Sequence, residues 1–222
     1  MKKTICALGF LAIAVTAAPA AADEYWTVDS GLYISGRASV QSVQASNATA
    51  LGNDQWEYDT GFGVIAAVGY AFVFPEYGVS LRGEIEGSYR LAENTDVYFA
   101  NGYYWDVVDG DTIYRSGMVN ILIDVHTQTR FAPYFGAGIG RTLLRFNNWI
   151  VDVYDGTGAY IGRAVYPERD YDISVWQAIA GVGFHLSPGL AVELEYRFFQ
   201  PNDPGFNGYI SNEVSLGVRM IF

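Results

Sequence analysis

The sequence predicts an all-β protein, an eight-stranded antiparallel up-and-down β-barrel that spans a membrane. Three observations predict it: apolar and polar residues alternate along the strands, connections are alternately short and long, and aromatic residues gather towards strand ends. Alternation with a period of two gives a strand two chemically different faces. Short turns on one rim and long loops on the other are typical of outer-membrane barrels.

The alternation is clearest in the segment Ile173–Phe199, ISVWQAIAGVGFHLSPGLAVELEYRFF. We interpret it as two strands joined at Ser187-Pro188-Gly189, because proline and glycine favour tight turns. After this turn, one face is apolar and the other is charged. The apolar face holds Leu190, Val192, Leu194, Tyr196 and Phe198, and the charged face holds Glu193, Glu195 and Arg197.

Eight strands are expected in all. Their predicted ranges are Ser30–Gln41, Gly61–Phe74, Gly78–Leu91, Ser116–Thr127, Arg130–Leu143, Ile173–Leu186, Gly189–Phe199 and Tyr209–Phe222. Two long connections are predicted to form hairpins of their own, at Trp105–Tyr114 and Val151–Ile161, because each has apolar arms around an Asp-Gly pair.

The N-terminal residues 1–22 are expected to be a cleaved signal peptide, with Lys2 and Lys3 before an apolar core and small residues at Ala20-Ala21-Ala22. Residues 23–222 then form one barrel domain. This part has no cysteine and no lysine, and its 11 arginines against 24 acidic residues give a net charge of −13. Disulfides are therefore excluded, and nucleic acid is an unsuitable partner, because phosphate contacts need clustered cations.

Alternation alone does not decide which face meets the lumen, since a soluble lipocalin-type barrel is apolar inside. The apolar face, however, carries aromatic rings near both strand ends, as in the aromatic girdles of membrane barrels. Near the short turns are Phe72, Phe74, Phe131, Phe184 and Phe222, and near the long loops are Phe62, Tyr89, Trp176 and Phe198. The opposite face is small and polar, with Gly136, Gly138 and Gly140 in one strand. We therefore expect the apolar face to meet lipid.

The polar face supplies charged residues that should line the lumen. They are Arg37, Arg82, Glu84, Glu86, Arg90, Asp124, Glu193, Glu195, Arg197 and Arg219. Five arginines and five acids predict an ion-pair network of zero net charge, because buried charges need partners. An eight-stranded barrel leaves just enough room for its own side chains, so we expect a closed lumen. A narrow or gated ion path is the alternative.

Three segments resemble the small opacity-like and OmpA-type outer-membrane barrels. Ala132–Gly140 is similar to their fifth-strand signature, and Trp176–Phe184 and Glu193–Phe198, with the Ser-Pro-Gly turn, are similar to their sixth–seventh hairpin. The resemblance implies a porin-like protein or surface antigen in the outer membrane of a Gram-negative bacterium, surrounded by lipid and lipopolysaccharide, with both termini periplasmic. Phe222 resembles the signal that barrel-assembly machinery recognises.

The expected function is that of a non-enzymatic, monomeric barrel that contributes to envelope integrity and presents its loops to a host or surface ligand. Aromatic residues suited to recognition lie in these loops: Tyr103, Tyr104, Trp105, Trp149, Tyr154, Tyr160, Tyr166 and Tyr171. The alternatives are a narrow porin and a lipid A-modifying enzyme.

An enzyme is disfavoured because ester hydrolysis needs a nucleophile next to a base. The only histidines, His126 and His185, are expected in the lumen near the short turns. No cofactor or metal is expected either. The Asp109-Gly110-Asp111 segment and the pair Asp152 and Asp155 offer too few oxygen ligands for Ca²⁺.

Overall fold

The structure is a computed structural model. It describes residues 29–48, 54–58, 60–98, 104–127, 129–147, 149–202 and 209–222. The expected signal peptide, Tyr103 and the side chain of Trp105 lie outside the described residues. Within the described ranges, no α-helix is long and apolar enough to cross a membrane.

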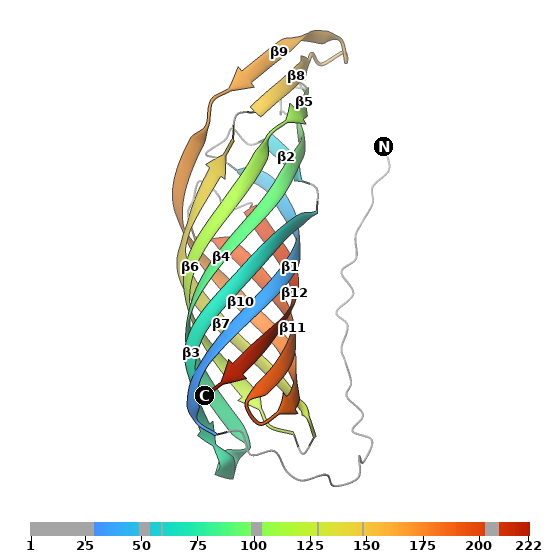
Figure 1. Ribbon diagram of the computed structural model, residues 1–222. Helices are drawn as coiled ribbons and strands as arrows, with labels where there is room; N and C mark the ends of the chain where they lie inside the picture. The colour runs from blue at the N-terminus through green and yellow to red at the C-terminus, as the bar shows by residue number, and fades with distance from the viewer. Residues whose placement is uncertain are drawn as a thin grey trace.

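Strands account for almost all of the described chain. They are β1 (Gly31–Ala48), β2 (Asp54–Tyr58), β3 (Gly61–Phe74), β4 (Val79–Tyr98), β5 (Tyr104–Asp109), β6 (Asp111–Val125), β7 (Phe131–Phe146), β8 (Trp149–Tyr154), β9 (Tyr160–Tyr166), β10 (Arg169–Ser187), β11 (Leu190–Pro201) and β12 (Tyr209–Ile221), with one 3₁₀ turn, η2 (Pro75–Tyr77). Eight of them, β1, β3, β4, β6, β7, β10, β11 and β12, form the wall, which closes where β12 pairs with β1 (Figure 1). The predicted eight-stranded antiparallel barrel is confirmed.

The other four strands are continuations of wall strands. β2 leads into β3, and both pair with β4, through Tyr58–Asn94 and Phe62–Leu91. β5 leads into β6, and both pair with β4. β7 continues as β8, and β9 leads into β10, so that the pairing of β7 with β10 is resumed by β8 with β9. The wall therefore consists of eight long strands, of which four are interrupted once.

The predicted hairpin at Trp105–Tyr114 is wrong. Its arms, β5 and β6, pair with β4 on one side and with β8 and β7 on the other, and not with each other. Gly110 joins them with a φ of 145°, which glycine adopts easily, so Asp109-Gly110 interrupts one strand instead of reversing the chain. The second predicted hairpin is present, because β8 and β9 are antiparallel with Asp152 opposite Arg163.

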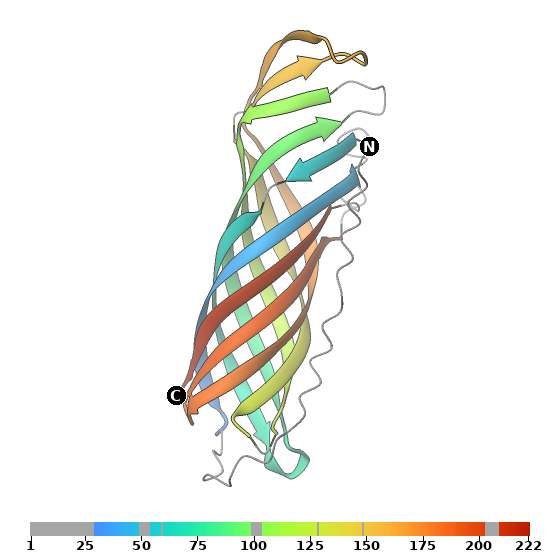
Figure 2. The same cartoon turned by 90° about the vertical axis from the view of Figure 1, so that its right-hand side faces the viewer.

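One side of the barrel rises above the other. The last pair between β10 and β11 is Val175–Pro201, and the last pair between β1 and β12 is Ala45–Tyr209. Beyond these pairs, β1, β2, β4, β5, β8 and β9 continue as an open curved sheet (Figure 2). Much of what the sequence suggested to be loop is therefore strand, and the strand predicted to end at Leu91 continues to Tyr98. We call this end of the barrel the loop end and the other the turn end.

The two faces of the wall differ as predicted. Outward apolar side chains are widely exposed, with Phe62 66%, Ile85 65% and Ile139 70% exposed. Inward side chains are buried, and Arg82 and Arg197 are 0% exposed. The barrel interior therefore holds the charged residues.

Candidate functional site: the charged lumen

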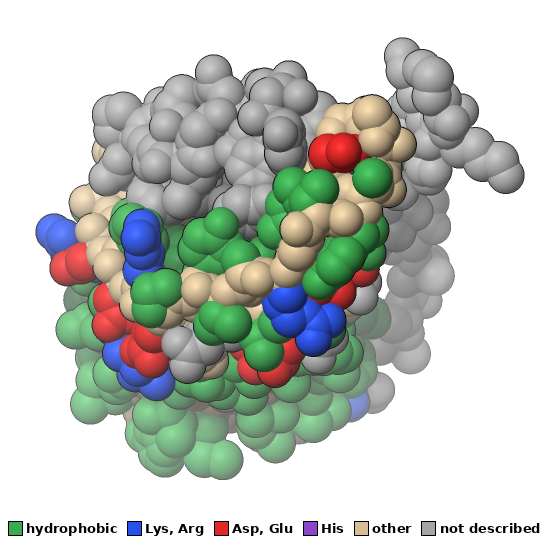
Figure 3. Space-filling model, turned by 90° about the horizontal axis from the view of Figure 1, so that it is seen from above, with side chains coloured by type: hydrophobic (Ala, Val, Ile, Leu, Met, Phe, Trp, Pro, Cys, Tyr) green, Lys and Arg blue, Asp and Glu red, His purple; other side chains and the backbone are tan. Residues whose placement is uncertain are grey.

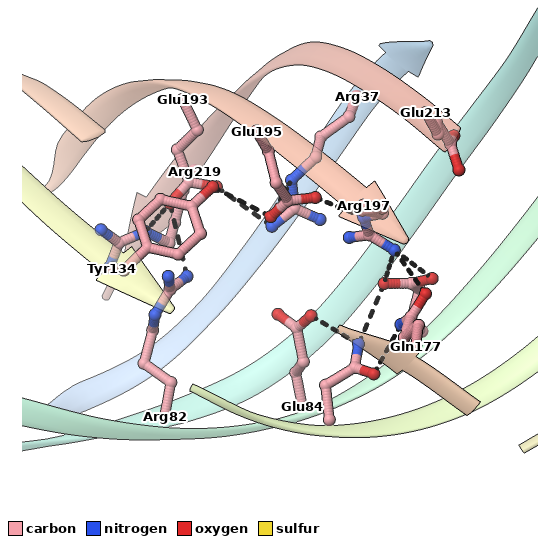
Figure 4. A network of polar contacts seen from close by, with 12 residues as sticks. Arg37, Arg82, Glu84, Tyr134, Gln177, Glu193, Glu195, Arg197, Glu213 and Arg219 are labelled. Atoms are coloured by element: carbon pink, nitrogen blue, oxygen red, sulfur yellow. Dashed lines mark hydrogen bonds and ion pairs between the residues drawn. The ribbon is translucent and has the colours of Figure 1, made fainter. Parts of the chain in front are cut away.

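The structure places all ten predicted charged residues inside the barrel. They occupy alternate positions of five wall strands, β1, β4, β6, β11 and β12, and none is more than 4% exposed. The alternation of each strand produces this arrangement, because every second side chain points to the same face. Figure 4 shows several of them, among them Arg37, Arg82 and Glu193, converging from different strands.

The group nearest the turn end is centred on Glu193 of β11. Its Oε2 accepts a hydrogen bond from Arg37 Nη2 at 3.0 Å, and its Oε1 accepts one from Arg219 Nε at 2.8 Å. Arg82 Nη1 lies 3.3 Å from the same Oε1, and Arg82 Nη2 is 2.9 Å from Asp124. Three guanidinium groups therefore share one buried carboxylate.

A glycine allows the Arg37–Glu193 pair to form. Glu193 on β11 is opposite Gly217 on β12, and Gly217 is opposite Arg37 on β1. A Cβ atom at Gly217 would lie 2.5 Å from Arg37 Cγ and 2.2 Å from a backbone oxygen. The absence of a side chain on the middle strand is therefore required for the two charges to meet above it.

The middle of the lumen is organised by Asn120 of β6. Its Nδ2 donates to Glu84 Oε1 at 2.8 Å and to Glu86 Oε2 at 3.0 Å, while its Oδ1 accepts from Gln177 Nε2 at 2.7 Å. The neighbouring Gly138 leaves room for it, because a Cβ there would lie 1.8 Å from Asn120 Oδ1. One amide thus holds two carboxylates of the same strand.

The group nearer the loop end contains Arg197 and Arg90. Arg197 Nη1 lies 2.6 Å from Glu86, and its Nε also contacts Glu195. Arg90 donates through Nε to Glu213 Oε2 at 2.9 Å. Because these groups are buried, each guanidinium depends on its carboxylate partners for the interactions that water would otherwise supply.

Sequence reasoning missed Glu213, which is 1% exposed and paired with Arg90. The alternation of β12 could have revealed it, because Glu213 lies on the same face as Arg219. The predicted neutrality of the lumen is therefore wrong: among the residues that the structure describes, six buried carboxylates face five guanidinium groups. Of these six described carboxylates, Glu84 is the one that forms no ion pair, and its donors, the hydroxyl of Tyr33 at 2.8 Å and the amide of Asn120, are neutral.

Tyr33 and Tyr134 were missed as well. The Tyr134 hydroxyl donates to Glu195 Oε2 at 2.9 Å, and its ring centroid lies 4.6 Å from the guanidinium carbon of Arg82. A Cβ at Gly181 would lie 2.5 Å from the same ring. These aromatic rings fill the space between the charged groups, as an inward glycine in a predicted strand can indicate.

An apolar cluster, which the sequence did not predict, begins at the level of Arg90 and Glu213 and continues towards the loop end. Its buried members are Val43, Ala92, Tyr114, Met118, Leu144, Phe146, Trp149, Val151, Ile173, Val175 and Phe199. Two of its members, Trp149 and Val151, come from β8 and are 5% and 0% exposed. Trp149 is therefore part of the interior and not of the predicted surface rim, and Tyr171 packs against the same cluster.

The rim of the loop end carries exposed ion pairs. Arg145 forms two hydrogen bonds with Asp170, at 2.8 and 2.9 Å, and Arg163 forms two with Asp152, at 2.7 and 2.9 Å. Figure 3 shows acidic and basic side chains next to each other on this rim, among apolar ones. In the β8–β9 turn, hydrogen bonds from the Thr157 side chain and from backbone amides lower the pKa of Asp155 below its usual range.

Catalysis and metal binding depend on how the His, Cys, Asp and Glu side chains are grouped. In the part of the chain that the structure describes, no three His, Cys, Asp or Glu side chains are arranged to hold a metal ion. His185 is 6% exposed, and neither of its ring nitrogens has a hydrogen-bond partner. Among the described residues, His185 is therefore not hydrogen-bonded to a nucleophile, whereas the Ser80 hydroxyl donates to Asp124 Oδ2 at 2.9 Å.

Sequence comparison identifies the family. The family described as outer membrane protein beta-barrel domain matches residues 8–222. The chain belongs to this family. No curated protein is similar enough to match. As a member of the outer membrane β-barrel family, the protein places its outward apolar face in the lipid of the outer membrane.

Solved structures of the same architecture are similar to this barrel. Neisserial surface protein A is 19% identical, with a TM-score of 0.53, over 87% of this chain and 99% of that one. Ail of Yersinia pestis is 15% identical, with a TM-score of 0.48, over 86% and 99%. OprG of Pseudomonas aeruginosa is 13% identical, with a TM-score of 0.48, over 86% and 96%. At these identities the likeness to Neisserial surface protein A shows the fold alone.

Proposed function

We propose that this outer-membrane barrel is a non-enzymatic, monomeric surface protein whose lumen is closed to solutes. In this proposal residues 23–222 form the mature chain, the turn end and both termini are periplasmic, and the loop end is outside the cell. The two ends of the described chain lie together at the turn end, where the Phe222 amide donates to Leu32 O at 2.8 Å. The barrel would contribute to envelope integrity, because its wall strands are hydrogen-bonded to one another around a filled interior.

The proposal rests on two sets of buried side chains, one charged and one apolar, that fill the lumen. Buried arginines and carboxylates extend from the turn end to Arg90 and Glu213, and a buried apolar cluster packs beside that last pair and continues towards the loop end. An ion passing through would have to separate buried ion pairs, at a cost of several kcal/mol, and then cross an apolar layer without hydration. Both barriers favour a closed barrel over the alternative of a narrow porin.

Solute efflux tests closure. The purified full-length protein would be folded into phospholipid vesicles loaded with salt and small sugars, and release would be followed after dilution. We expect release no faster than from protein-free vesicles. Rapid release that depends on folded protein would overturn closure and favour the porin.

We propose that the projecting sheet is the interaction surface. In the described part of the chain β9 pairs only with β8, so one edge of its backbone is open. Apolar side chains on this strand are exposed, with Tyr160 56%, Ile161 54% and Val165 65% exposed. Open edges and exposed apolar groups are suited to an added strand from a partner.

Replacing residues 152–163 with a short turn, which keeps Trp149 and Val151 of the buried cluster in place, would test this role. We expect the shortened barrel to assemble and to lose adhesion to host cells or survival in serum. Exchange of residues 94–114 provides a second variant from the same rim. Normal adhesion and survival of both variants would contradict the proposal.

Lipopolysaccharide and the barrel-assembly machinery are the other proposed partners. Phe222 is 72% exposed and is therefore accessible to an assembly factor. Changing Phe222 to Ser should lower the amount of folded barrel in the membrane without changing folding into vesicles in vitro.

The proposed absence of enzymatic activity is tested on lipid A. A mass spectrum of lipid A that changes when the protein is overexpressed would overturn it.

A further inference from the structure

Two arginines mark the loop-end limit of the lipid-facing band on neighbouring strands. The outward residues of β6 are apolar or glycine throughout residues 117–125, and Arg115 follows them. Those of β7 are apolar throughout residues 131–139, and Arg141 follows them. Each run is nine residues long, which is the length of a tilted strand that crosses a bilayer. Arg115 and Arg141 therefore lie where acyl chains end and lipid headgroups begin.

The strand register brings the two side chains next to each other on the outer surface. Arg115 lies between Tyr89 on β4 and Leu143 on β7. One step towards the band, Arg141 is the β7 partner of Gly117. A Cβ at Gly117 would meet nothing within 4 Å, so the surface below Arg115 and beside Arg141 is open.

The charge of Arg115 is not balanced by a carboxylate in the part of the chain that the structure describes. Arg141 and Arg145 form ion pairs with Asp172 and Asp170, at 2.9 and 2.8 Å, whereas no described carboxylate forms an ion pair with Arg115. Its guanidinium carbon lies 5.8 Å from the centroid of the Tyr89 ring, which holds the group over an aromatic face. A fixed cation without a counter-ion at the headgroup level is complementary to an anionic headgroup.

We propose that Arg115, together with Arg141, binds the phosphate of a phosphorylated lipid in the outer leaflet. Arginine suits this ligand, because its planar guanidinium forms paired hydrogen bonds with phosphate oxygens. The acyl chains lie along the band below, against Val119 and Ile139, which are 57% and 70% exposed. The inference rests on the proposed orientation, in which the loop end faces the outer leaflet.

Lipid binding to the full-length protein in detergent micelles tests the site. The probe is diphosphoryl lipid A, titrated by native mass spectrometry, beside the same lipid with its phosphates removed. Arg115→Gln should weaken binding of the phosphorylated lipid roughly tenfold or more, since it removes a charge-assisted contact. Arg115→Lys should retain most of the binding, and removal of the phosphates should weaken binding to wild type by a similar factor.

Arg169→Gln is the matched control. Arg169 is an exposed arginine of β10. Asp170 and Asp172 lie on the outward face of this strand, and Arg169 lies on its other face. We expect it to change lipid binding less than twofold. Equal effects of Arg115→Gln and Arg169→Gln, or equal binding of the two lipids, would overturn the site.

The same variants separate this inference from the proposed function. Arg115 faces outward and takes no part in the lumen, so Arg115→Gln should leave vesicles as impermeable as wild type does. If Arg115→Gln bound diphosphoryl lipid A as well as wild type does, while vesicles stayed impermeable, only the lipid site would be refuted. Solute release from wild-type vesicles would refute the closed lumen alone.

Discussion

Arg37 of β1 and Glu193 of β11 form an ion pair, 3.0 Å long, across the intervening strand β12, where Gly217 has no side chain to separate them. The pair joins strands from the two ends of the chain, next to the place where the barrel closes. Glu193 also binds Arg82 from the opposite wall. Closure of the sheet and closure of the lumen therefore depend on the same contacts.

Gly217→Val should lower the free energy of unfolding by about 3 kcal/mol, because the new side chain overlaps Arg37 and separates a buried ion pair. Urea-dependent unfolding in phospholipid vesicles, followed by tryptophan fluorescence, measures this change. Gly36→Val is the control: Gly36 is the residue next to Arg37 and faces outward, and a Cβ there would meet nothing within 4 Å. Equal losses in both variants would show that the pair is not the cause.

Two adjacent carboxylates of β4 should respond differently to the loss of charge. Glu86→Gln removes a charged partner of Arg197, which lies 2.6 Å away, and should cost about 3 kcal/mol of unfolding free energy. Glu84→Gln should cost less than about 1 kcal/mol, because both donors to Glu84 are neutral. The same unfolding assay compares them. A larger loss for Glu84→Gln would contradict the assignment of Glu84 as the carboxylate without an ion pair.

Leu194→Arg tests which face meets lipid. Leu194 is 46% exposed on the outward face of β11, so an arginine there should cost about 2–4 kcal/mol of folding free energy in a bilayer. Gln200→Arg is the control, on the same face of the same strand but above the apolar band. Folding yield into vesicles, read by electrophoretic mobility without heating, separates the two. Normal folding of Leu194→Arg would mean that the faces are reversed.

Trp149→Ala tests the apolar filling of the loop end. Removal of this side chain, which is 5% exposed, should lower the free energy of unfolding by about 3–5 kcal/mol through the cavity it leaves. Trp176→Ala removes an outward tryptophan that is 37% exposed and should cost less. Thermal unfolding of the two variants, both in one detergent, compares their losses of stability. If Trp149→Ala were the milder change, β8 would not contribute to the filling.

Alternation predicted the faces correctly, because it depends only on the period of a strand. It placed residues as distant as Arg37 and Arg219 on the inward face without any knowledge of their partners. The partners themselves could not be predicted. They depend on the register between strands, which places Gly217 between Arg37 and Glu193 and so allows the two side chains to meet.

The predictions failed where one local pattern permits two structures. Asp109-Gly110 suits a turn, but here it interrupts a strand that continues beside β4. Trp149 suits an exposed recognition loop, but β8 carries it into the apolar cluster. In both cases tertiary pairing decided the outcome. Glu213 differs from these cases, because it shares the inward face of β12 with Arg219 and the alternation of that strand is sufficient to place it.

Single-channel recording of the wild-type protein in planar bilayers tests the closed lumen most directly. Insertion of folded barrel would be verified by its electrophoretic mobility without heating. We predict no conductance steps above the bare bilayer at any applied voltage that the bilayer withstands. Regular steps that appear with folded wild-type protein and not with the unfolded chain would contradict the account.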